Sequence, residues 1–113
     1  MIKEEHLLFA YGTLLDTEIQ LAVFNSVKKL EADTLQNFEA GWVNEEETSY
    51  PAIQKAQGKS VPGAVMSLSP VELEKADEYE GPAYIRTICH VESGKEVWVY
   101  TAAPGKYRPG DSQ

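Results

Sequence analysis

Residues 69–82 read SPVELEKADEYEGP and carry the signals of one complete short helix. Ser69 suits the N-cap position, Pro70 suits the first helical position, and Glu72 completes a capping box with Ser69. Gly81, which a proline follows, ends the helix. These signals predict one short helix in the second half of the chain, with both of its ends defined.

The inward face of this helix carries two carboxylates. The side chains spaced at i, i+3, i+4 and i+7 share one face, and they are Leu73, Ala76, Asp77 and Glu80. A carboxylate in the last turn of an inward face loses solvation and meets the negative end of the helix dipole, and both effects raise its pKa toward the range useful for proton transfer. Glu80 is therefore a candidate catalytic group. A frayed helix end with Glu80 in water explains the spacing equally well, and Asp77 is the alternative buried carboxylate.

Size and composition define the class of protein. The 113 residues predict a single domain over residues 1–113, and the 42% hydrophobic and 25% charged content is typical of a soluble globular protein. The net charge of −8 argues against nucleic acid and anionic membrane as partners, because both bind basic surfaces. Cys89 is the only cysteine, so an intramolecular disulfide is excluded. The polar start and the lack of a long apolar stretch predict a cytoplasmic protein.

The rest of the chain shows mainly strand signals. Extended segments are expected at residues 7–10, 30–43, 50–53, 61–68, 84–91 and 96–101, the last two as a hairpin. Pro51 indicates an edge segment, and Gly63 permits either close approach of another backbone or a bulge. Asp16 or Thr17 can cap a second short helix that ends near residue 24, whereas residues 104–110 are expected to be irregular. Many strands with two short helices predict an α+β domain whose sheet curls into a small barrel.

The turn Tyr11-Gly12-Thr13-Leu14 connects the first strand to the first helix. Gly12 allows a ligand or another backbone to approach closely, and successive amide N–H groups that enter a helix can hold a carboxylate or an oxyanion. An ordinary strand-to-helix turn explains the same residues and is the simpler interpretation of this segment alone.

Other reactive side chains match no known site. Cys89 and His90 are neighbours on a predicted strand, where adjacent side chains point to opposite faces, so they form no catalytic dyad. His6 and His90 have no metal-ligand partners at useful spacing, and no glycine-rich phosphate loop is present. Neither a metal site nor a cofactor is expected.

The aromatic residues and one acidic run complete the set of candidates. Trp42, Trp98 and Tyr100 are expected in the core, whereas Tyr50, Tyr84 and Tyr107 flank turns and are better placed to line a pocket. The run NEEE at residues 44–47 is interpreted as a solvated loop.

Four segments recur in the same order in a known protein family. They are residues 8–14 (LFAYGTL), 50–52 (YPA), 61–65 (VPGAV) and 77–86 (DEYEGPAYIR). Through them the chain resembles the gamma-glutamylcyclotransferase-like superfamily, in particular its AIG2-like and gamma-glutamylamine cyclotransferase branch. Each segment is a weak signal alone, but four in the right order are fairly specific.

The resemblance implies a small mixed β-barrel with flanking short helices and a cofactor-independent enzyme. In this family a Y-G-[ST]-[LN] loop holds the γ-glutamyl group through backbone amides, and the catalytic glutamate precedes a glycine. By match of position, the implied substrate-binding residues are Tyr11, Gly12, Thr13, Leu14 and Tyr84, and the implied catalytic residue is Glu80.

The reaction that the resemblance implies is an intramolecular cyclisation. The α-amine of a γ-glutamyl amine or related γ-glutamyl compound attacks its own γ-carbonyl, which releases 5-oxoproline and an amine, with Glu80 as general acid and base. The expected partner is therefore a small γ-glutamyl substrate. Leu14 stands where enzymes for γ-glutamyl amino acids often carry Asn, which favours the amine-releasing or an uncharacterised branch.

Two other functions fit the same residues. A non-catalytic module would bind a small carboxylate or amine in the same pocket, and an interaction domain would use an exposed strand edge near Tyr50 and Pro51. The observation that best separates these hypotheses is whether Glu80 and the amides of residues 11–14 face one cavity.

Overall fold

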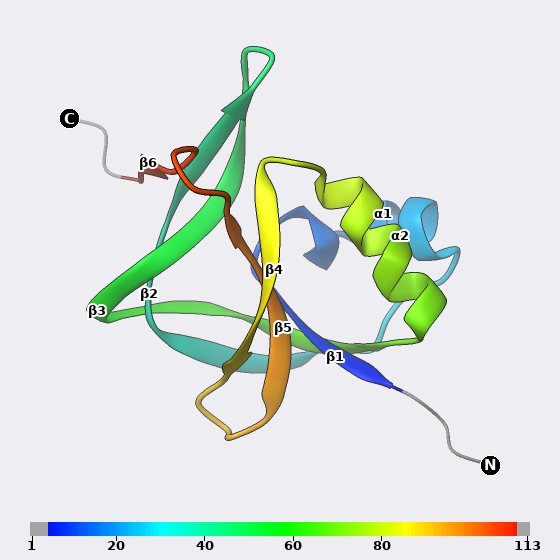
Figure 1. Cartoon of the computed structure of the whole chain (residues 1–113). Coiled ribbons are helices and arrows are strands. Elements are labelled where there is room, and N and C mark those ends of the chain that lie inside the picture. The colour runs from blue at the N-terminus through cyan, green and yellow to red at the C-terminus, as the bar shows by residue number, and fades with distance from the viewer. Residues whose placement is uncertain (1–4, 111–113) are drawn as a thin grey trace.

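The computed structural model describes residues 5–110, which form one mixed sheet, two α-helices and one short 3-10 helix (Figure 1). In chain order the elements are β1 (His6–Ala10), η1 (Thr13–Leu15), α1 (Thr17–Phe24), β2 (Glu31–Glu45), β3 (Thr48–Leu68), α2 (Pro70–Glu80), β4 (Tyr84–His90), β5 (Glu96–Ala102) and β6 (Arg108–Pro109). Both predicted helices are present, and the predicted α+β class is confirmed.

The strands of the described chain form one sheet in the order β4-β5-β1-β3-β2-β6. β1 runs parallel to β5, whereas the other neighbouring pairs are antiparallel. The sheet curls into an open half-barrel, and the two helices lie together on one outer side of it (Figure 1). This is the small mixed β-barrel with flanking short helices that the sequence predicts.

The long hairpin of β2 and β3 bends sharply in its middle (Figure 1). The pairing register shifts between Gln36 and Phe38, which marks a bulge. Asn37 lies between them with a φ of 68°, a left-handed conformation that asparagine tolerates. Its side-chain oxygen accepts a hydrogen bond from the amide of Gly58 at 3.1 Å. This contact joins the two strands at the bend.

The bend divides β3 into two halves with different neighbours. Residues 64–68 pair with β1, whereas the half that begins at Thr48 pairs only with β2 among the described strands. Pro51 lies in this N-terminal half of β3, opposite Trp42, so its expected edge position is confirmed. The prediction of two separate extended segments was wrong, because the bulge that keeps both halves in one strand depends on pairing between strands.

Buried side chains of the described residues form three hydrophobic cores, and side chains that alternate along β1 enter the two larger ones. On β1, Leu8 and Ala10 pack with the helices, whereas Phe9 packs inside the curled sheet. Helix α2 contributes Leu73 and Ala76 to the first core, which confirms its predicted inward face. A Cβ at Gly63 would overlap the carbonyl oxygen of Ala10 and the ring of Phe9, so β1 and β3 require the glycine that the sequence suggested.

Helix α2 has both predicted ends. The Ser69 hydroxyl accepts a hydrogen bond from the Glu72 amide at 3.1 Å, and the Glu72 carboxylate accepts one from the Ser69 amide at 2.9 Å. Gly81 is the C-cap with a φ of 78°, and its amide donates to the carbonyl of Asp77. Helix α1 begins after the N-cap Asp16, one of the two caps that the sequence offered.

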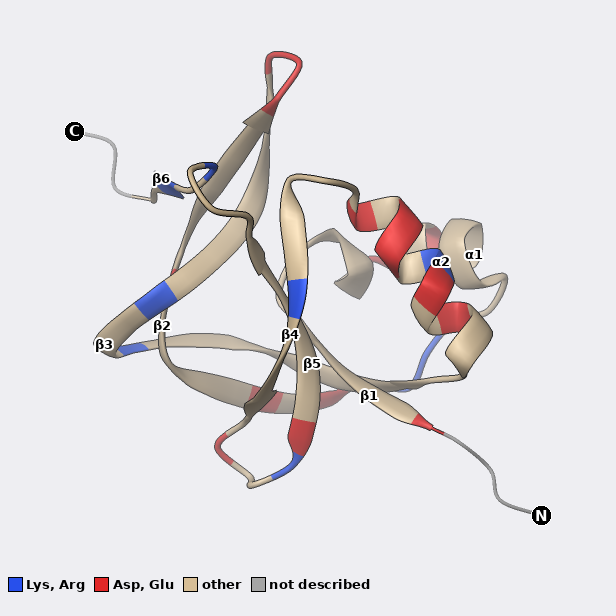
Figure 2. Ribbon diagram, viewed as in Figure 1, with Lys and Arg blue, Asp and Glu red and all other residues tan. Residues whose placement is uncertain are grey.

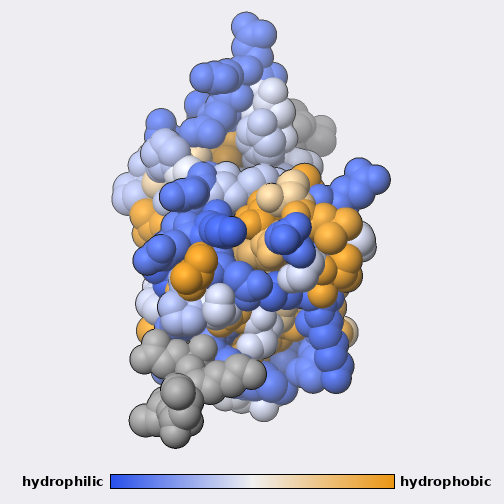
Figure 3. All heavy atoms as spheres, turned by 90° about the vertical axis from the view of Figure 1, so that its right-hand side faces the viewer, coloured by the Kyte–Doolittle hydropathy of each residue, from blue (hydrophilic) through white to orange (hydrophobic). Residues whose placement is uncertain are grey.

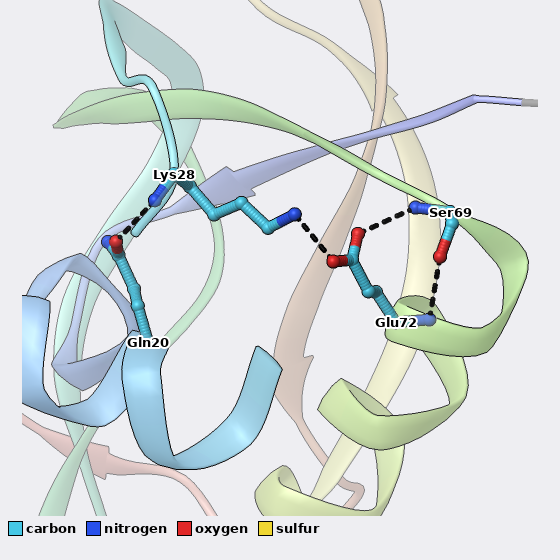
Figure 4. A network of polar contacts seen from close by, with 4 residues as sticks. All are labelled: Gln20, Lys28, Ser69 and Glu72. Carbon is cyan, nitrogen blue, oxygen red and sulfur yellow. Dashed lines mark hydrogen bonds and ion pairs between the residues drawn. The ribbon is translucent and has the colours of Figure 1, made fainter. Parts of the chain in front are cut away.

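A polar network joins α1, the segment that follows it and the start of α2 (Figure 4). Gln20 is 1% exposed, donates to the carbonyl of Leu14 at 2.9 Å and accepts from the amide of Lys28 at 2.8 Å. The ammonium group of Lys28 lies 2.7 Å from the carboxylate of Glu72. Gln20 therefore holds the chain on both sides of α1, including the turn at residues 11–14.

The outer surface differs from the sequence prediction in two places. The tail, expected to be irregular, adds strand β6, which pairs with Gly41 and Trp42. Trp42, expected in the core, is 42% exposed because it alternates along β2 with the buried Gly41 and Val43. Within residues 5–110, no helix is long and apolar enough to cross a membrane.

Charged and apolar groups are unevenly distributed on the surface. Acidic residues gather on α2 and at the tip of the β2–β3 hairpin (Figure 2). On the side that carries the helices, apolar atoms lie in patches between hydrophilic ones (Figure 3). The two acidic regions belong to the elements that enclose the cavity described next.

Candidate functional site

A cavity of about 260 Å³ lies between the end of β1, the tip half of the β2–β3 hairpin and the C-terminal end of α2. Its lining consists of Leu8, Phe9, Ala10, Tyr11, Gly12, Thr13, Leu14, Glu45, Tyr50, Pro51, Tyr79, Glu80, Tyr84 and Tyr100. The six residues that the sequence assigned to catalysis or substrate binding are all in this lining. The fold thus brings the turn at residues 11–14 and Glu80 to one cavity.

Glu80 is the last residue of α2 and lies partly buried in the cavity wall. Burial raises the pKa of its carboxyl group to about 7. Within residues 5–110, no hydrogen bond or ion pair engages this carboxyl group. A carboxyl group with this pKa and no protein partner can take a proton from a ligand and return it.

Asp77 lies one turn before Glu80, and its carboxylate accepts hydrogen bonds from two other side chains. The Arg86 guanidinium donates to both of its carboxylate oxygens, at 2.8 and 3.1 Å, and the Tyr100 hydroxyl donates to Oδ1 at 2.6 Å. The same guanidinium stacks 4.1 Å from the centre of the Trp98 ring. Asp77 therefore ties α2 to β4 and β5, whereas Glu80 faces the cavity.

The turn at residues 11–14 is held in place by contacts from three directions. The Tyr11 hydroxyl donates to the carbonyl of Tyr100 at 2.6 Å, and the hydroxyls of Thr13 and Tyr79 lie 2.6 Å apart. A Cβ at Gly12 would lie 3.3 Å from Pro51, so the turn passes close to the hairpin.

The first amides of this turn make no hydrogen bond inside η1. The first hydrogen bonds inside η1 come from the amides of Leu15 and Asp16, to the carbonyls of Gly12 and Thr13. The amides of Thr13 and Leu14 therefore precede the first internal bond of the turn, where helical N–H groups have no partner within the helix. Such N–H groups can bind a carboxylate or an oxyanion.

Tyr84 closes the cavity beside Glu80. Its hydroxyl donates to the carbonyl of Pro51 at 2.6 Å, which joins the start of β4 to the hairpin. Burial raises the pKa of this phenol, and the nearby carboxylates of Glu80 and Glu45 raise it further. The pKa of Tyr11 is raised by burial first, then by Tyr84 and Glu80. Both phenols therefore stay protonated and neutral at physiological pH.

Sequence reasoning placed some side chains correctly and missed others. Tyr50 lines the cavity as expected, but Tyr107 lies elsewhere and donates to Glu39 at 3.3 Å. Glu45, interpreted as part of a solvated loop, is the last residue of β2 and lines the cavity, because the turn proper begins at residue 46. Tyr79 is also in the lining, and its place beside Glu80 on the helix is the signal that was overlooked.

Cys89 and His90 lie on β4 away from the cavity. Cys89 packs partly against the inner core, where burial raises the pKa of its thiol. His90 is exposed, with its ring nitrogen 4.0 Å from the Glu96 carboxylate. The part of the chain that the structure describes contains no group of His, Cys, Asp and Glu arranged to hold a metal ion.

Comparison with known proteins connects this cavity to a family. The sequence profile described as gamma-glutamyl cyclotransferase, AIG2-like, matches residues 8–113, which is nearly the whole chain. The chain belongs to this family. Among curated protein sequences, none matches it significantly.

Several solved structures share the fold of this chain. A gamma-glutamyl cyclotransferase is 26% identical, with a TM-score of 0.74 over 93% of this chain and 69% of its own. An uncharacterized protein from Homo sapiens is 26% identical, with a TM-score of 0.77 over 94% of this chain and 70% of its own. An AIG2-like protein from Mus musculus, at 19% identity, shares the fold with a TM-score of 0.69 over 96% of this chain and 89% of its own. Family and fold together support a gamma-glutamyl cyclotransferase-like function.

Proposed function

We propose that this AIG2-like protein is a cyclotransferase that converts a γ-glutamyl amine, or a related γ-glutamyl compound, into 5-oxoproline and a free amine. The observation that carries the proposal is that Glu80 and the turn at residues 11–14 line one cavity. A volume of about 260 Å³ suits a small ligand. The family match and the likeness to a solved gamma-glutamyl cyclotransferase support the reaction class.

In the proposed reaction, the Glu80 carboxylate removes a proton from the α-ammonium group of the substrate. The freed nitrogen attacks the γ-carbonyl carbon and forms a tetrahedral intermediate with a negatively charged oxygen. The bond to the leaving nitrogen breaks, and the five-membered lactam remains. Two protons leave the attacking nitrogen and both end on the departing amine, so the reaction balances without water or a cofactor. Glu80, with a pKa of about 7, moves these protons.

The other lining residues hold the substrate in a folded conformation. The amides of the turn at residues 11–14 bind either the α-carboxylate or the developing oxyanion. Tyr11 and Tyr84 form neutral walls, and their hydroxyls are engaged by backbone carbonyls. Because the attack is intramolecular, holding the chain in a closed conformation supplies a large part of the rate enhancement.

The test is an assay of 5-oxoproline release from a panel of γ-glutamyl amines and γ-glutamyl amino acids. Glu80→Gln is expected to lower kcat/KM by at least about 100-fold, because it removes the proton shuttle and keeps the shape. Glu78→Gln is the matched control, since this neighbour is exposed on the same helix and outside the cavity lining. Turnover that survives in Glu80→Gln would exclude the assigned mechanism.

A non-catalytic binding module gives a different result in the same samples. Ligands would then raise the melting temperature without release of 5-oxoproline, and Glu80→Gln would retain this shift. The two functions are thus separated by measuring binding and turnover on one set of compounds.

A further inference from the structure

Glu80 shares its cavity with a second carboxylate, that of Glu45. Glu45 ends β2, next to the two-residue turn of the hairpin, and its residue is partly buried. No hydrogen bond or ion pair within the described chain engages its side chain. Its charge acts on Tyr84, whose pKa it raises together with Glu80. The two carboxylates therefore approach the cavity from different elements and act on one tyrosine.

No lysine or arginine of residues 5–110 lines this cavity to balance the two glutamates. The remaining polar lining consists of neutral tyrosines and Thr13. Two carboxylates without a cation give the cavity a negative potential, which favours a ligand that carries positive charge. Tyrosine rings add to the attraction of an ammonium group.

The γ-glutamyl group carries one ammonium group, which can neutralise one of the two glutamates. In the proposed function, its ammonium group pairs with Glu80, and the amides of the turn at residues 11–14 bind its carboxylate or the developing oxyanion. Glu45 is then left without a partner. The leaving amine is the part of the substrate that remains to satisfy it.

We propose that Glu45 is a specificity-determining residue that selects leaving amines carrying a second, terminal ammonium group, as in α,ω-diamines. This inference rests on the proposed function, because it concerns the same cavity and the leaving group of the same reaction. A leaving amino acid brings a carboxylate that faces Glu45 without a compensating cation, and a leaving alkylamine brings no charge. The expected order of preference is diamine, then alkylamine, then amino acid.

The experiment uses three substrates of equal length that differ only at the far end of the leaving group. They are the γ-glutamyl amides of 1,5-diaminopentane, of hexylamine and of 5-aminopentanoic acid, and 5-oxoproline release is measured for each. Wild type should prefer the diamine amide over the hexylamine amide. Glu45→Gln should reduce this preference by about fivefold to tenfold, as expected for one partly buried ion pair. Glu47→Gln removes one negative charge from the exposed hairpin turn and should leave the preference unchanged.

A binding measurement keeps this inference separate from the proposed function. The melting temperature of wild type, Glu45→Gln and Glu47→Gln is measured with free 1,5-diaminopentane and with hexylamine. A diamine-specific stabilisation that Glu45→Gln alone abolishes supports the subsite even if no substrate is turned over, in which case only the proposed reaction fails. Equal responses of wild type and Glu45→Gln to the diamine, with equal substrate preference, would overturn the assignment of Glu45.

Discussion

Asp77 and Glu80 lie one turn apart on the same face of α2, yet within residues 5–110 only Asp77 has partners for its carboxylate. Two hydrogen bonds from Arg86 and one from Tyr100 engage Asp77. Glu80 is placed in the cavity wall, where burial raises its pKa to about 7. The two carboxylates on this helix face therefore have different roles. Asp77 joins α2 to β4 and β5, whereas Glu80 is available to a ligand in the cavity.

Glu80 is expected to make stability fall as pH rises. Its pKa is about 7 in the folded protein against 4.5 for the free group, so the folded state binds more protons between these values. Ionisation of Glu80 therefore lowers the free energy of unfolding. This loss is absent below about pH 4.5 and complete above about pH 7, where it reaches at most about 3 kcal/mol. Glu80→Gln should therefore match wild type at pH 4 and exceed its stability at pH 8. Urea unfolding at both pH values measures this, and a difference independent of pH would contradict it.

The same carboxyl group should control the pH dependence of turnover. The proposed base must be ionised to accept the substrate's proton, so kcat/KM should rise with pH and level off above about 7. Release of 5-oxoproline measured from pH 5 to 8 gives the profile. A flat profile over this range would rule out a titrating base with this pKa.

Asp77→Asn should destabilise the fold more than it impairs chemistry. The variant loses the charge that pairs with Arg86, in a contact where Asp77 is 40% exposed. We expect a loss of about 1–2 kcal/mol, reduced by solvent screening, and a decrease in kcat of less than about tenfold. Urea unfolding and steady-state kinetics measure the two effects. Glu78→Gln changes the charge equally at an exposed site and should be neutral. A loss of activity as large as that of Glu80→Gln would place Asp77 in the chemistry instead.

Gln20→Leu should weaken both the fold and substrate binding. The carbonyl of Leu14 and the amide of Lys28 would lose their partner, at a cost of about 2–4 kcal/mol for two backbone groups. Because Leu14 belongs to the turn that lines the cavity, KM should rise more than kcat falls. Gln36→Leu changes the same atoms at an exposed position and serves as control. Unchanged stability of Gln20→Leu would show that water replaces the lost bonds.

The parts of the fold that the sequence predicted are those set by neighbouring residues. The capping box at Ser69 and Glu72, the end of α2 at Gly81 and the burial of Leu73 and Ala76 all depend on spacing within one helix. These local signals also brought out Glu80 as a candidate, although its pairing with the turn at residues 11–14 required the family resemblance.

Features that depend on distant contacts could not be predicted in this way. The bulge at Asn37 depends on Gly58, and the position of Glu45 depends on where the hairpin turns. Strand β6 consists of two residues, and within the described chain its sheet partners are on β2, so its own sequence carries no strand signal. The exposure of Trp42 follows from the register of β2, which composition does not reveal.

The bend at Asn37 has a consequence for how such a protein can diverge. It separates the tip half of the β2–β3 hairpin, which carries Glu45 and Tyr50, from the barrel strands. Glu80, in contrast, belongs to a helix capped at both ends. Substitutions in the tip half of this hairpin can therefore change which substrates bind, while the proposed proton-transfer group on α2 stays the same. Selection for new substrates can act on one hairpin without rebuilding the chemistry.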